Sequence, residues 1–432
     1  MNIERPKTVM ILGKGGREAA LQWKLRQSPL VGNIMNTPSS LDLSNTDHVI
    51  QYAKDTNPDM IIVGPEELLV AGIVDAVQRI GIDIFGPTRA AAIEGSKTDQ
   101  ILFMQRHGIP HPRSVLFDRF DNARRFAANP LWVDRTDHYG LVVKADGLCK
   151  GKGVFVCSTY DEANEAIECL MVKEEFGEAG KRVVIQEKLE GVEVSCMALV
   201  DGERFLLLPF SEDYKQLFDG DCGPNTGGMG SVAPHPFLAD RPELQDEILN
   251  KILRPTIAGL AHEGRPFRGC LYPGMMVTVD GPKVLEYNVR FGDPETEAVL
   301  PIISEDIFGP IAAIAAGQRL QMSRAAWYRP EVCVVVAMAS SGYPEHPRGG
   351  DLIEGLDLAE KVYSAIVFHA GMTQNAANQW ITDGGRVLMV AGRGRDIPSA
   401  RANAMNAVGE IRFANMQFRR DIGLRRSKWH SK

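Results

Sequence analysis

The sequence predicts a protein of mixed α/β and α+β class, built from several domains. Short apolar runs alternate with helical stretches over the first part of the chain, which is typical of a parallel sheet covered by helices. Strand patterns joined by tight turns dominate the middle, and short strands with glycine turns follow toward the end. At 432 residues the chain is too long for one hydrophobic core, so about two to four domains are expected.

The composition is that of a globular protein in water. Apolar residues make up 44% of the chain and charged residues 24%. The net charge of −7 and the pI near 5.8 argue against a general attraction to nucleic acid or to an anionic membrane. No stretch of about 18 apolar residues occurs, and the apolar run near the N-terminus is too short for a signal peptide, so a cytoplasmic location is expected. The seven cysteines include no CxxC pair, which favours reduced, buried thiols over a metal or disulfide role.

Three apolar runs define the expected strands of the N-terminal sheet. They are TVMILG, MIIVGP and IDIFGP, which begin at Thr8, Met60 and Ile82, and helical patterns at 17–28 and 68–80 lie between them. In such a sheet ligands usually bind at the carboxyl ends of the strands. The sequence therefore places a candidate binding region at the turns that follow these runs.

The first of these turns, GKGGREAA, invites a dinucleotide-binding interpretation. That pattern needs a third glycine where this chain has Glu18, and no acid sits at the end of the next strand. Two other interpretations remain. The turn could hold an anion on the backbone N–H groups of a helix N-terminus, or it could be a tight turn with a purely structural role.

The character of the sequence changes after the first domain. The segment GSKTDQILFMQRHGIPHP predicts a helix that ends at Gly108, because the prolines that follow cannot continue it. Asp-Gly pairs at Asp201 and Asp280 lie between strand patterns and predict antiparallel hairpins. Beyond residue 329 the pattern is one of short strands and a last helix near 400–411, and the basic tail is expected to be solvated.

A glycine-rich hairpin is expected within VVKADGLCKGKGVFV, residues 142–156. Its loop carries Lys150 and Lys152, and its glycine spacing does not match a Walker loop, because too few residues precede the Gly-Lys pair and a strand follows it. A loop of this kind can close over phosphates with backbone N–H groups and lysine charge. The alternative is a surface hairpin with solvated lysines.

Acids and a lysine stand at the strand ends around this loop. Lys144 lies inside an apolar strand, where an ammonium group needs an anion or a carboxylate as its partner. Glu187 ends one strand and Glu193 begins the next, a connection that could receive the adenine and ribose of a nucleotide. Taken alone, the two acids are also ordinary turn residues.

The stretch FDGDCGPNTGGMGS, residues 218–231, is the most glycine-dense part of the chain. A long loop inside a compact domain is usually functional. Its backbone N–H groups, with Asn225 and Thr226, suit a small carboxylate or a phosphate. A packed Ω-loop is the alternative.

The segment KVLEYNVRFGDPETE, residues 283–297, carries the strongest signal. In an extended chain Glu286, Asn288 and Arg290 share one face. The first two offer oxygen ligands to a hard ion such as Mg²⁺, while Arg290 and Asp293 extend the same edge toward an anionic substrate. A polar face turned to solvent is the alternative, and the lysine strand upstream weighs against it.

These motifs together resemble the phosphoribosylamine-glycine ligases, the glycinamide ribonucleotide synthetases of purine biosynthesis, which are ATP-grasp enzymes. The resemblance rests on KADGLCKGKGV, DGDCGPNTGGMG, RGCLYPGMM and LEYNVRFGDPETE, and it covers nearly the whole chain, with GGRE at the front and VFHAG, GGRVL and IRFANMQFRRDIG at the end. It implies a Rossmann-like N-terminal domain at 1–93, an ATP-grasp domain at 94–328 with a lid subdomain at about 113–187, and a small β-rich C-terminal domain at 329–432.

The resemblance also implies a reaction. ATP and glycine would form glycyl phosphate, and the amine of 5-phosphoribosylamine would attack it to give the amide, ADP and phosphate. Phosphorylation is needed because a carboxylate is a poor acyl donor at neutral pH. Implied with the reaction are ATP, Mg²⁺ or Mn²⁺ as cofactors, small-molecule substrates, no nucleic acid or membrane partner, and a monomer or weak homodimer.

Site residues follow from the resemblance motif by motif. ATP contacts are implied for Lys97, Lys144, Gly151, Lys152, Gly153, Glu187 and Glu193. Metal ligation is implied for Glu286 and Asn288, and catalytic roles for Arg290, Lys144 and Asp293. Contacts to glycine are implied for Asn225, Thr226, Gly227, Gly228, Arg290 and Asp293, and contacts to the phosphate side of the ribosylamine for Gly16, Arg17, Gly64, Pro65 and Glu66. Substrate contacts are also implied for Asp213, Lys215 and Gly292.

The chain departs from the family pattern at three places. Ala19 stands where the family usually has His, a shorter loop follows residue 35, and Tyr214 and Gln216 replace a His and an Arg. These changes are expected to cluster on the side of the acceptor amine. Two alternatives therefore stay open: a divergent ATP-grasp ligase that joins another amino acid and another amine, and a nucleotide-binding protein without catalysis.

Overall fold

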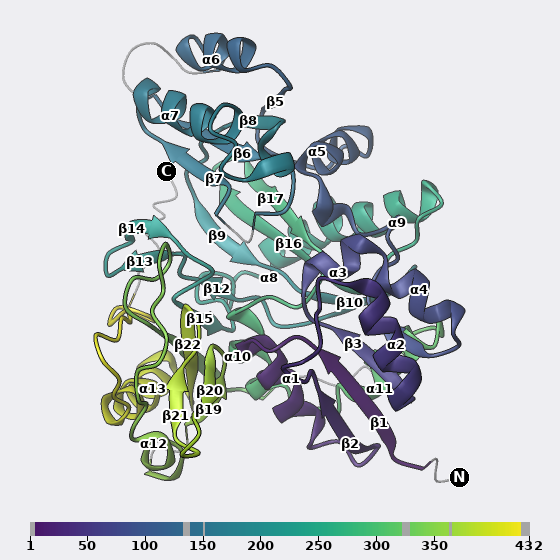
Figure 1. Ribbon diagram of the computed structural model, residues 1–432. Helices are drawn as coiled ribbons and strands as arrows, with labels where there is room; N and C mark the ends of the chain where they lie inside the picture. Colours follow the sequence, from purple (N-terminus) through teal and green to yellow (C-terminus); the bar gives the residue numbers. More distant parts are fainter. Residues whose placement is uncertain (1–4, 133–138, 150–151, 322–328, 363–364, 425–432) are drawn as a thin grey trace.

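The computed structural model describes residues 5–132, 139–149, 152–321, 329–362 and 365–424 (Figure 1). It contains three α/β and α+β parts in the order expected from the sequence. The N-terminal part lies beside the C-terminal part, and the lid of the central part projects above both (Figure 1). No helix among the described residues is long and apolar enough to cross a membrane.

The N-terminal part is built on a parallel sheet. Its strands are β1 (Lys7–Leu12), β2 (Val31–Asn36), β3 (Met60–Val63) and β4 (Asp83–Phe85), in the order β2-β1-β3-β4. Its helices are α1 (Gly16–Leu25), α2 (Thr46–Thr56), α3 (Glu66–Ala71) and α4 (Ile73–Arg79). Strands β1 and β3 are almost completely buried, as continuous apolar runs in a parallel sheet should be.

The central part contains two antiparallel sheets. The lid sheet has the order β5-β8-β6-β7, made of β5 (Ser114–Phe117), β8 (Val183–Glu187), β6 (Leu141–Ala145) and β7 (Val154–Cys157). Helices α6 (Phe120–Ala128) and α7 (Tyr160–Met171) cover it. The base sheet has the order β11-β10-β16-β17 with β9 also on β16, made of β9 (Val192–Ser195), β10 (Ala198–Asp201), β11 (Phe205–Leu207), β16 (Arg268–Thr278) and β17 (Gly281–Asn288).

Helices and hairpins predicted from the central sequence are confirmed. Helix α5 (Lys97–Arg106) begins after the N-cap Ser96 and ends before Gly108, whose φ of +62° suits a residue without a Cβ. Both predicted Asp-Gly turns join paired strands, β10 to β11 and β16 to β17. Around the base sheet lie α8 (Pro242–Ile248), α9 (Arg254–His262), α10 (Glu295–Val299) and α11 (Phe308–Ala315).

The glycine-dense stretch at 218–231 is more regular than a loop. It contributes to the hairpin of β13 (Gln216–Phe218) and β14 (Cys222–Asn225) and to strand β15 (Gly230–Ala233). Gly223 in this hairpin has a φ of +83°, and a Cβ there would lie 2.6 Å from the Phe218 ring. The glycines therefore serve the tight return of the chain as well as any ligand.

The C-terminal sheet draws strands from two parts of the chain. Its order is β12-β15-β18-β22-β19, made of β12 (Glu212–Asp213), β15, β18 (Val332–Ala339), β22 (Arg386–Gly394) and β19 (Ile366–His369). Helix α13 (Ile397–Glu410) packs on it closely, since a Cβ at Gly392 would lie 2.3 Å from the Ala404 nitrogen. The remaining elements are α12 (Leu356–Val362), β20 (Met372–Gln374) and β21 (Trp380–Thr382).

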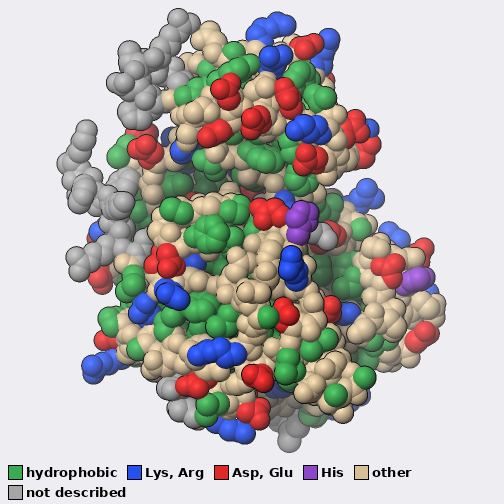
Figure 2. All heavy atoms as spheres, turned by 60° about the vertical axis from the view of Figure 1, so that its left-hand side comes forward, with side chains coloured by type: hydrophobic (Ala, Val, Ile, Leu, Met, Phe, Trp, Pro, Cys, Tyr) green, Lys and Arg blue, Asp and Glu red, His purple; other side chains and the backbone are tan. Residues whose placement is uncertain are grey.

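The domains share a core. One buried cluster joins Val9 of β1 and Leu21 of α1 to Val335 of β18 and Met389 of β22. Burial of this apolar surface holds the N-terminal and C-terminal parts together. On the face shown in Figure 2, acidic and basic side chains of the described residues are interspersed, in keeping with the modest net charge.

Candidate active site

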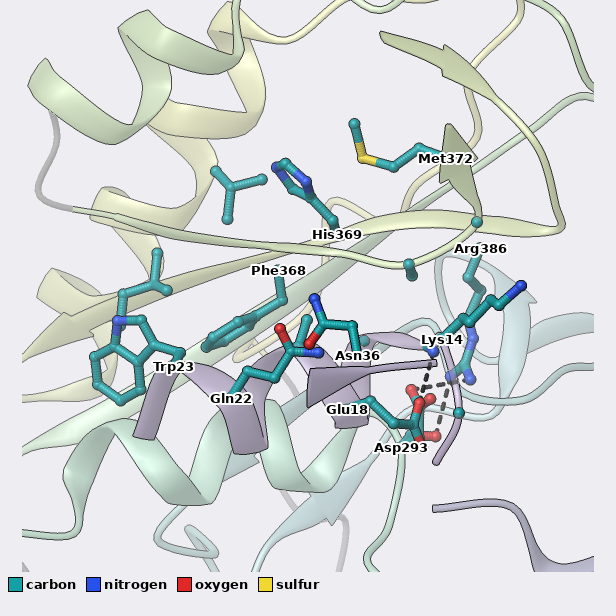
Figure 3. A pocket seen from close by; sticks show the side chains of 18 of the residues that line it. Lys14, Glu18, Gln22, Trp23, Asn36, Asp293, Phe368, His369, Met372 and Arg386 are labelled. Carbon is teal, nitrogen blue, oxygen red and sulfur yellow. Dashed lines mark hydrogen bonds and ion pairs between the residues drawn. The ribbon is translucent and has the colours of Figure 1, made fainter. Parts of the chain in front are cut away.

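Two cavities lie side by side at the junction of the domains. The central cavity, of about 390 Å³, lies between the lid sheet and the base sheet. The α1 cavity, of about 1050 Å³, lies between the N-terminal end of α1 and strands β19 to β21 (Figure 3). Together they bring in residues from all three parts of the chain.

The lysine strand and the carboxylate strand meet in the central cavity. Lys144 on β6 donates from Nζ to the Leu285 carbonyl on β17 over 3.0 Å. Burial lowers the pKa of Lys144 to about 8, helped by the nearby charges of Lys97 and Lys215 and opposed by Glu286. The predicted phosphate-side lysine and the predicted metal strand therefore face the same space.

Glu286 remains an anion in spite of its surroundings. Burial acts to raise its pKa, but the charges of Lys215, Lys144 and Lys97 outweigh burial and hold the pKa below the ordinary value. A carboxylate surrounded by ammonium groups is charged at neutral pH. The negative charge of Glu286 is therefore available to bind a cation or to orient a substrate.

The residues present fit a divalent cation with few protein ligands. Glu286 supplies a carboxylate, and Asn288 donates its amide nitrogen to the Tyr272 carbonyl over 3.4 Å, which leaves its oxygen as the ligand atom. Among the described residues no group of three His, Cys, Asp or Glu could hold a metal. Such a site suits Mg²⁺, which keeps waters and takes other ligands from substrate phosphates.

Two acids expected to hold the adenosine lie in the wall of the central cavity. Glu187 accepts from the Arg113 backbone N–H at 2.9 Å and from its Nε at 2.7 Å, so its carboxylate is already engaged. Glu193 lies 3.5 Å from the Lys215 Nζ, and this charge raises the pKa of Lys215 in spite of burial. The backbone N–H of Glu187 is engaged as well, since it donates to the Arg113 carbonyl over 3.0 Å.

The glycine hairpin borders the central cavity only in part. Gly153 lines it, whereas Lys152 lines a neighbouring cleft between β7 and the β13–β14 hairpin. Lys150 and Gly151 lie outside the described residues. Lys97 reaches the cavity from the first turn of α5, a turn fixed by the Asp146 carboxylate, which accepts from the Thr98 N–H over 2.7 Å.

Arg290 is held at the end of the metal strand by two acids. Its Nε donates to Glu66 over 3.1 Å and its Nη2 lies 3.4 Å from Glu94. Although burial acts to raise it, the charges of Arg290 and Arg17 lower the pKa of Glu66 to about 2. Burial raises the pKa of Glu94 to about 7, opposed by Arg290. Glu94 was not predicted as a site residue. The only pattern in the sequence that could have indicated it is an acid next to an isoleucine.

The structure places the five residues expected on the acceptor side in different surroundings. Gly16 lines the α1 cavity, but Glu66 lines the central cavity. Arg17 is buried and donates from Nε to Glu18 over 2.7 Å and from Nη1 to the Phe291 carbonyl over 3.3 Å. A Cβ at Gly64 would lie 1.8 Å from Glu18 Oε1, so this glycine makes room for Glu18 rather than facing a cavity. Neither Gly64 nor Pro65 is among the described lining residues of either cavity.

Glu18 has a structural role at the position where a dinucleotide-binding turn has its third glycine. Its Oε2 accepts from the Gly15 N–H over 2.6 Å, so the side chain closes the start of α1 (Figure 3). The backbone N–H of Gly13 is also used, because it donates to Thr37 Oγ1 over 2.9 Å. Side chains of this chain therefore occupy two backbone N–H groups that a dinucleotide pyrophosphate would need.

Arg386 ties the glycine-dense segment to the end of the metal strand. Its Nη1 donates to the Gly227 carbonyl over 2.6 Å and to the Asp293 carbonyl over 3.0 Å, and its Nη2 lies 2.9 Å from Asp293 Oδ1. Thr226 in turn accepts from the Gly228 N–H over 3.0 Å. Arg386 was missed in the sequence, where GGRVL was noted only as a motif.

The C-terminal wall of the α1 cavity is aromatic. The His369 ring lies 4.8 Å from the Trp380 ring, edge to face, and Phe368 lies 6.1 Å from Trp23. Figure 3 shows His369 and Met372 above the cavity and Gln22, Asn36 and Glu18 below it. Phe368 and His369 belong to VFHAG, which the sequence linked to the family without a role.

The expected clustering of departures on the acceptor side is wrong for Tyr214. This side chain is fully buried in the C-terminal core, where its hydroxyl contacts Glu212 over 3.0 Å and accepts from the Gly423 N–H over 3.1 Å. Tyr214 lines neither cavity. Ala19 does line the α1 cavity, and Gln216 lines the central cavity. The physical reason is strand alternation, which turns residue 214 away from residues 213 and 215.

Family comparisons agree with this arrangement over nearly the whole chain. Residues 7–94 match the phosphoribosylglycinamide synthetase N domain, residues 95–296 the ATP-grasp (A) domain, and residues 332–425 the C domain. The structure is similar to a crystal structure of phosphoribosylamine–glycine ligase from Thermotoga maritima, with a TM-score of 0.79 and 31% identity over 96% of this chain and 100% of that one.

Curated relatives point to the same family. A phosphoribosylamine–glycine ligase from Rhodopirellula baltica is 42% identical over 96% of each chain. The chicken trifunctional purine biosynthetic protein adenosine-3 is 41% identical over 96% of this chain and 42% of that longer protein. The chain therefore belongs to the phosphoribosylglycinamide synthetase family, that is, the phosphoribosylamine–glycine ligases.

Proposed function

We propose that this protein joins glycine to 5-phosphoribosylamine through glycyl phosphate, with the conversion of ATP to ADP and phosphate. The observation that carries the proposal is the contact of Lys144 with Leu285, which brings the lysine strand of the lid to the strand that carries Glu286 and Asn288. A nucleotide tail and a cation can then meet in one cavity. The family relationship supports the same reaction.

The central cavity is the proposed ATP site. Lys97 and Lys144 would bind the phosphates, and Gly151, Lys152 and Gly153 would cover them. The backbone around Glu187, together with Glu193, would hold the adenosine. Mg²⁺ or Mn²⁺ on Glu286 and Asn288 would neutralise charge on the phosphates when bound.

Glycine is proposed to lie between the two cavities. Lys215 and Arg290 offer cationic groups to its carboxylate, while Asp213 offers a carboxylate to its ammonium group. The Asn225–Gly228 segment and Gly292 would close around so small a substrate, since a Cβ at Gly228 would lie 2.3 Å from Pro294. Positioning in this way supplies most of the rate increase when two reactants must meet.

The acceptor amine is proposed to bind in the α1 cavity. Lys14 and Arg386 offer cationic groups to a sugar phosphate, and the N-terminal end of α1 adds a favourable dipole. This assignment replaces Arg17, Gly64, Pro65 and Glu66 by residues that line the space. Ala19 leaves room near the ribose, and His369 offers an imidazole from the opposite wall.

The domain limits at 1–93, 94–328 and 329–432, with a lid at about 113–187, are proposed on the same basis. The lid sheet spans β5 to β8, which supports its limits. Strands β12 and β15, however, join the C-terminal sheet, so the glycine segment and Asp213 would respond to movement of the C-terminal part.

A substrate screen tests the function. Purified protein with ATP, glycine and Mg²⁺ is expected to release ADP only when phosphoribosylamine is present, and to form glycinamide ribonucleotide, detected by mass spectrometry. A divergent ligase is the second candidate, favoured by Ala19 in the α1 cavity. Turnover with another amine and none with phosphoribosylamine would support that candidate, and nucleotide binding without any turnover would contradict both.

A further inference from the structure

Glu297, a buried acid of α10, has no role in the reaction as proposed above. Glu297 is completely buried, and neither of its carboxylate oxygens has a hydrogen-bond partner among the described residues. A Cβ at Gly16 would lie 2.4 Å from Glu297 Oε1, so the carboxyl lies directly beneath the first turn of α1. An uncompensated carboxylate at such a place is costly, which calls for an explanation.

Asp293 is the neighbour that explains it. The two carboxyls lie against neighbouring positions of the same turn, with Asp293 Oδ2 3.3 Å from a Cβ at Gly15 and Glu297 Oε1 2.4 Å from a Cβ at Gly16, and Asp293 lines the α1 cavity (Figure 3). Two carboxylates both accept and neither donates, so they form no hydrogen bond with each other. One proton between them supplies the missing donor. The pair is therefore built to hold a proton at the wall of the acceptor cavity.

The charges around the pair balance one another. Burial and the Asp293 charge raise the pKa of Glu297 well above its ordinary value, while Arg386 on β22 and the N-terminal end of α1 favour the charged form. The other ionisable groups packed nearby are Asp213 on β12, Glu295 on α10, Arg17 and Glu18 on α1, and Tyr343, which faces Arg386. A pair under such opposing influences can exchange a proton with a neighbouring group.

We propose that Asp293 and Glu297 act as one proton-accepting pair for the attacking amine, in which Asp293 faces the substrate and Glu297 shares the proton from below. The proposal rests on the function given above. The amine lone pair forms a C–N bond with the carbonyl carbon of glycyl phosphate, and its N–H proton passes to Asp293. The C–O bond to phosphate then breaks with its electron pair on oxygen. The proton returns through solvent to the phosphate, which leaves as hydrogen phosphate.

The pH profile of Glu297→Gln tests the pair. The substitution keeps the shape of the side chain and removes the acid that shares the proton. The low-pH limb of kcat is expected to move to lower pH by about one unit, and the plateau to fall by about tenfold, with the KM values for ATP and glycine unchanged. Glu212→Gln is the matched control, because Glu212 is also buried but contacts Tyr214 in the C-terminal core. A Glu297→Gln profile that superimposes on the wild type would overturn the proposal.

A second measurement needs no substrate. Since the folded-state pKa of Glu297 is raised, its stabilisation is present at low pH and is lost as pH rises toward that raised value. Glu297→Gln should lack this loss, so the variant gains stability relative to wild type as pH rises above the ordinary carboxyl pKa of 4.5. Parallel stability curves for the two proteins would show that no proton is shared. This measurement does not depend on turnover. It therefore tests protonation of Glu297 even if the wild type shows no activity with phosphoribosylamine.

Discussion

Lys144 Nζ and the Leu285 carbonyl lie 3.0 Å apart across the central cavity, one on the lid sheet and the other on the base sheet. Because this contact spans two sheets, it fixes the distance between the lid and the strand that carries Glu286. An ammonium group that donates to only one carbonyl retains donors for a phosphate. The contact therefore holds the lid against the base sheet and leaves Lys144 able to donate to a nucleotide phosphate.

Charge on Lys144 should control ATP binding. Its pKa is lowered to about 8, so the free protein carries this charge below about pH 8 and loses it above. ATP affinity is expected to fall as pH rises from 7 to 9, which calorimetric titration can measure. Lys144→Arg keeps its charge and should give a flatter profile, and Lys144→Met should weaken kcat/KM for ATP by about 100-fold or more. An affinity of the wild type that does not change over this range would contradict the assignment.

Loss of the Glu286 carboxylate should remove the response to metal. Glu286→Gln is expected to lower ADP release by about 1000-fold while the circular dichroism spectrum is unchanged. Asp280→Asn, on the exposed turn of the same hairpin, is the control and should behave as wild type. Undiminished turnover of Glu286→Gln over a Mg²⁺ titration would refute the metal site.

Tyr214 should matter for stability and little for substrates. Tyr214→Phe removes a hydroxyl with two buried partners and is expected to cost about 1–3 kcal/mol of the free energy of unfolding, measured by chemical denaturation. KM values for all three substrates should stay within twofold, because Tyr214 lines neither cavity. A large rise in the KM for the amine, with stability unchanged, would place this residue back on the acceptor side.

Glu94 should make stability depend on pH. Burial raises its folded-state pKa to about 7, compared with an ordinary value of 4.5, so its stabilising contribution is present at low pH and is lost as pH rises through 7. Glu94→Gln should therefore flatten the curve between pH 4.5 and 7, by up to about 3 kcal/mol. The free energy of unfolding of both proteins across this range is the measurement. Equal slopes would show that Glu94 is ionised throughout.

The sequence by itself determined the fold class, the family and the lysine and carboxylate strands that face each other in the central cavity. Strand and helix patterns are local, so the parallel sheet, helix α5 and both Asp-Gly hairpins could be predicted. The face shared by Glu286, Asn288 and Arg290 follows from strand periodicity alone. Ligand-bearing residues that lie two apart on one strand need no tertiary information to be grouped.

Only the tertiary structure decided the acceptor side. The α1 cavity is closed by strands more than 300 residues distant from α1 in the sequence, and Arg386 and His369 enter it through packing of the C-terminal part. Glu297 lies buried beneath the first turn of α1 only because α10 packs there. Arg17 and Gly64 belong to family motifs, yet Arg17 donates to the Glu18 carboxylate and Gly64 leaves the space that this carboxylate occupies. The roles of these residues depend on which side chains become neighbours when the chain folds. The shared core of the N-terminal and C-terminal parts determines these neighbours, and no local sequence pattern does.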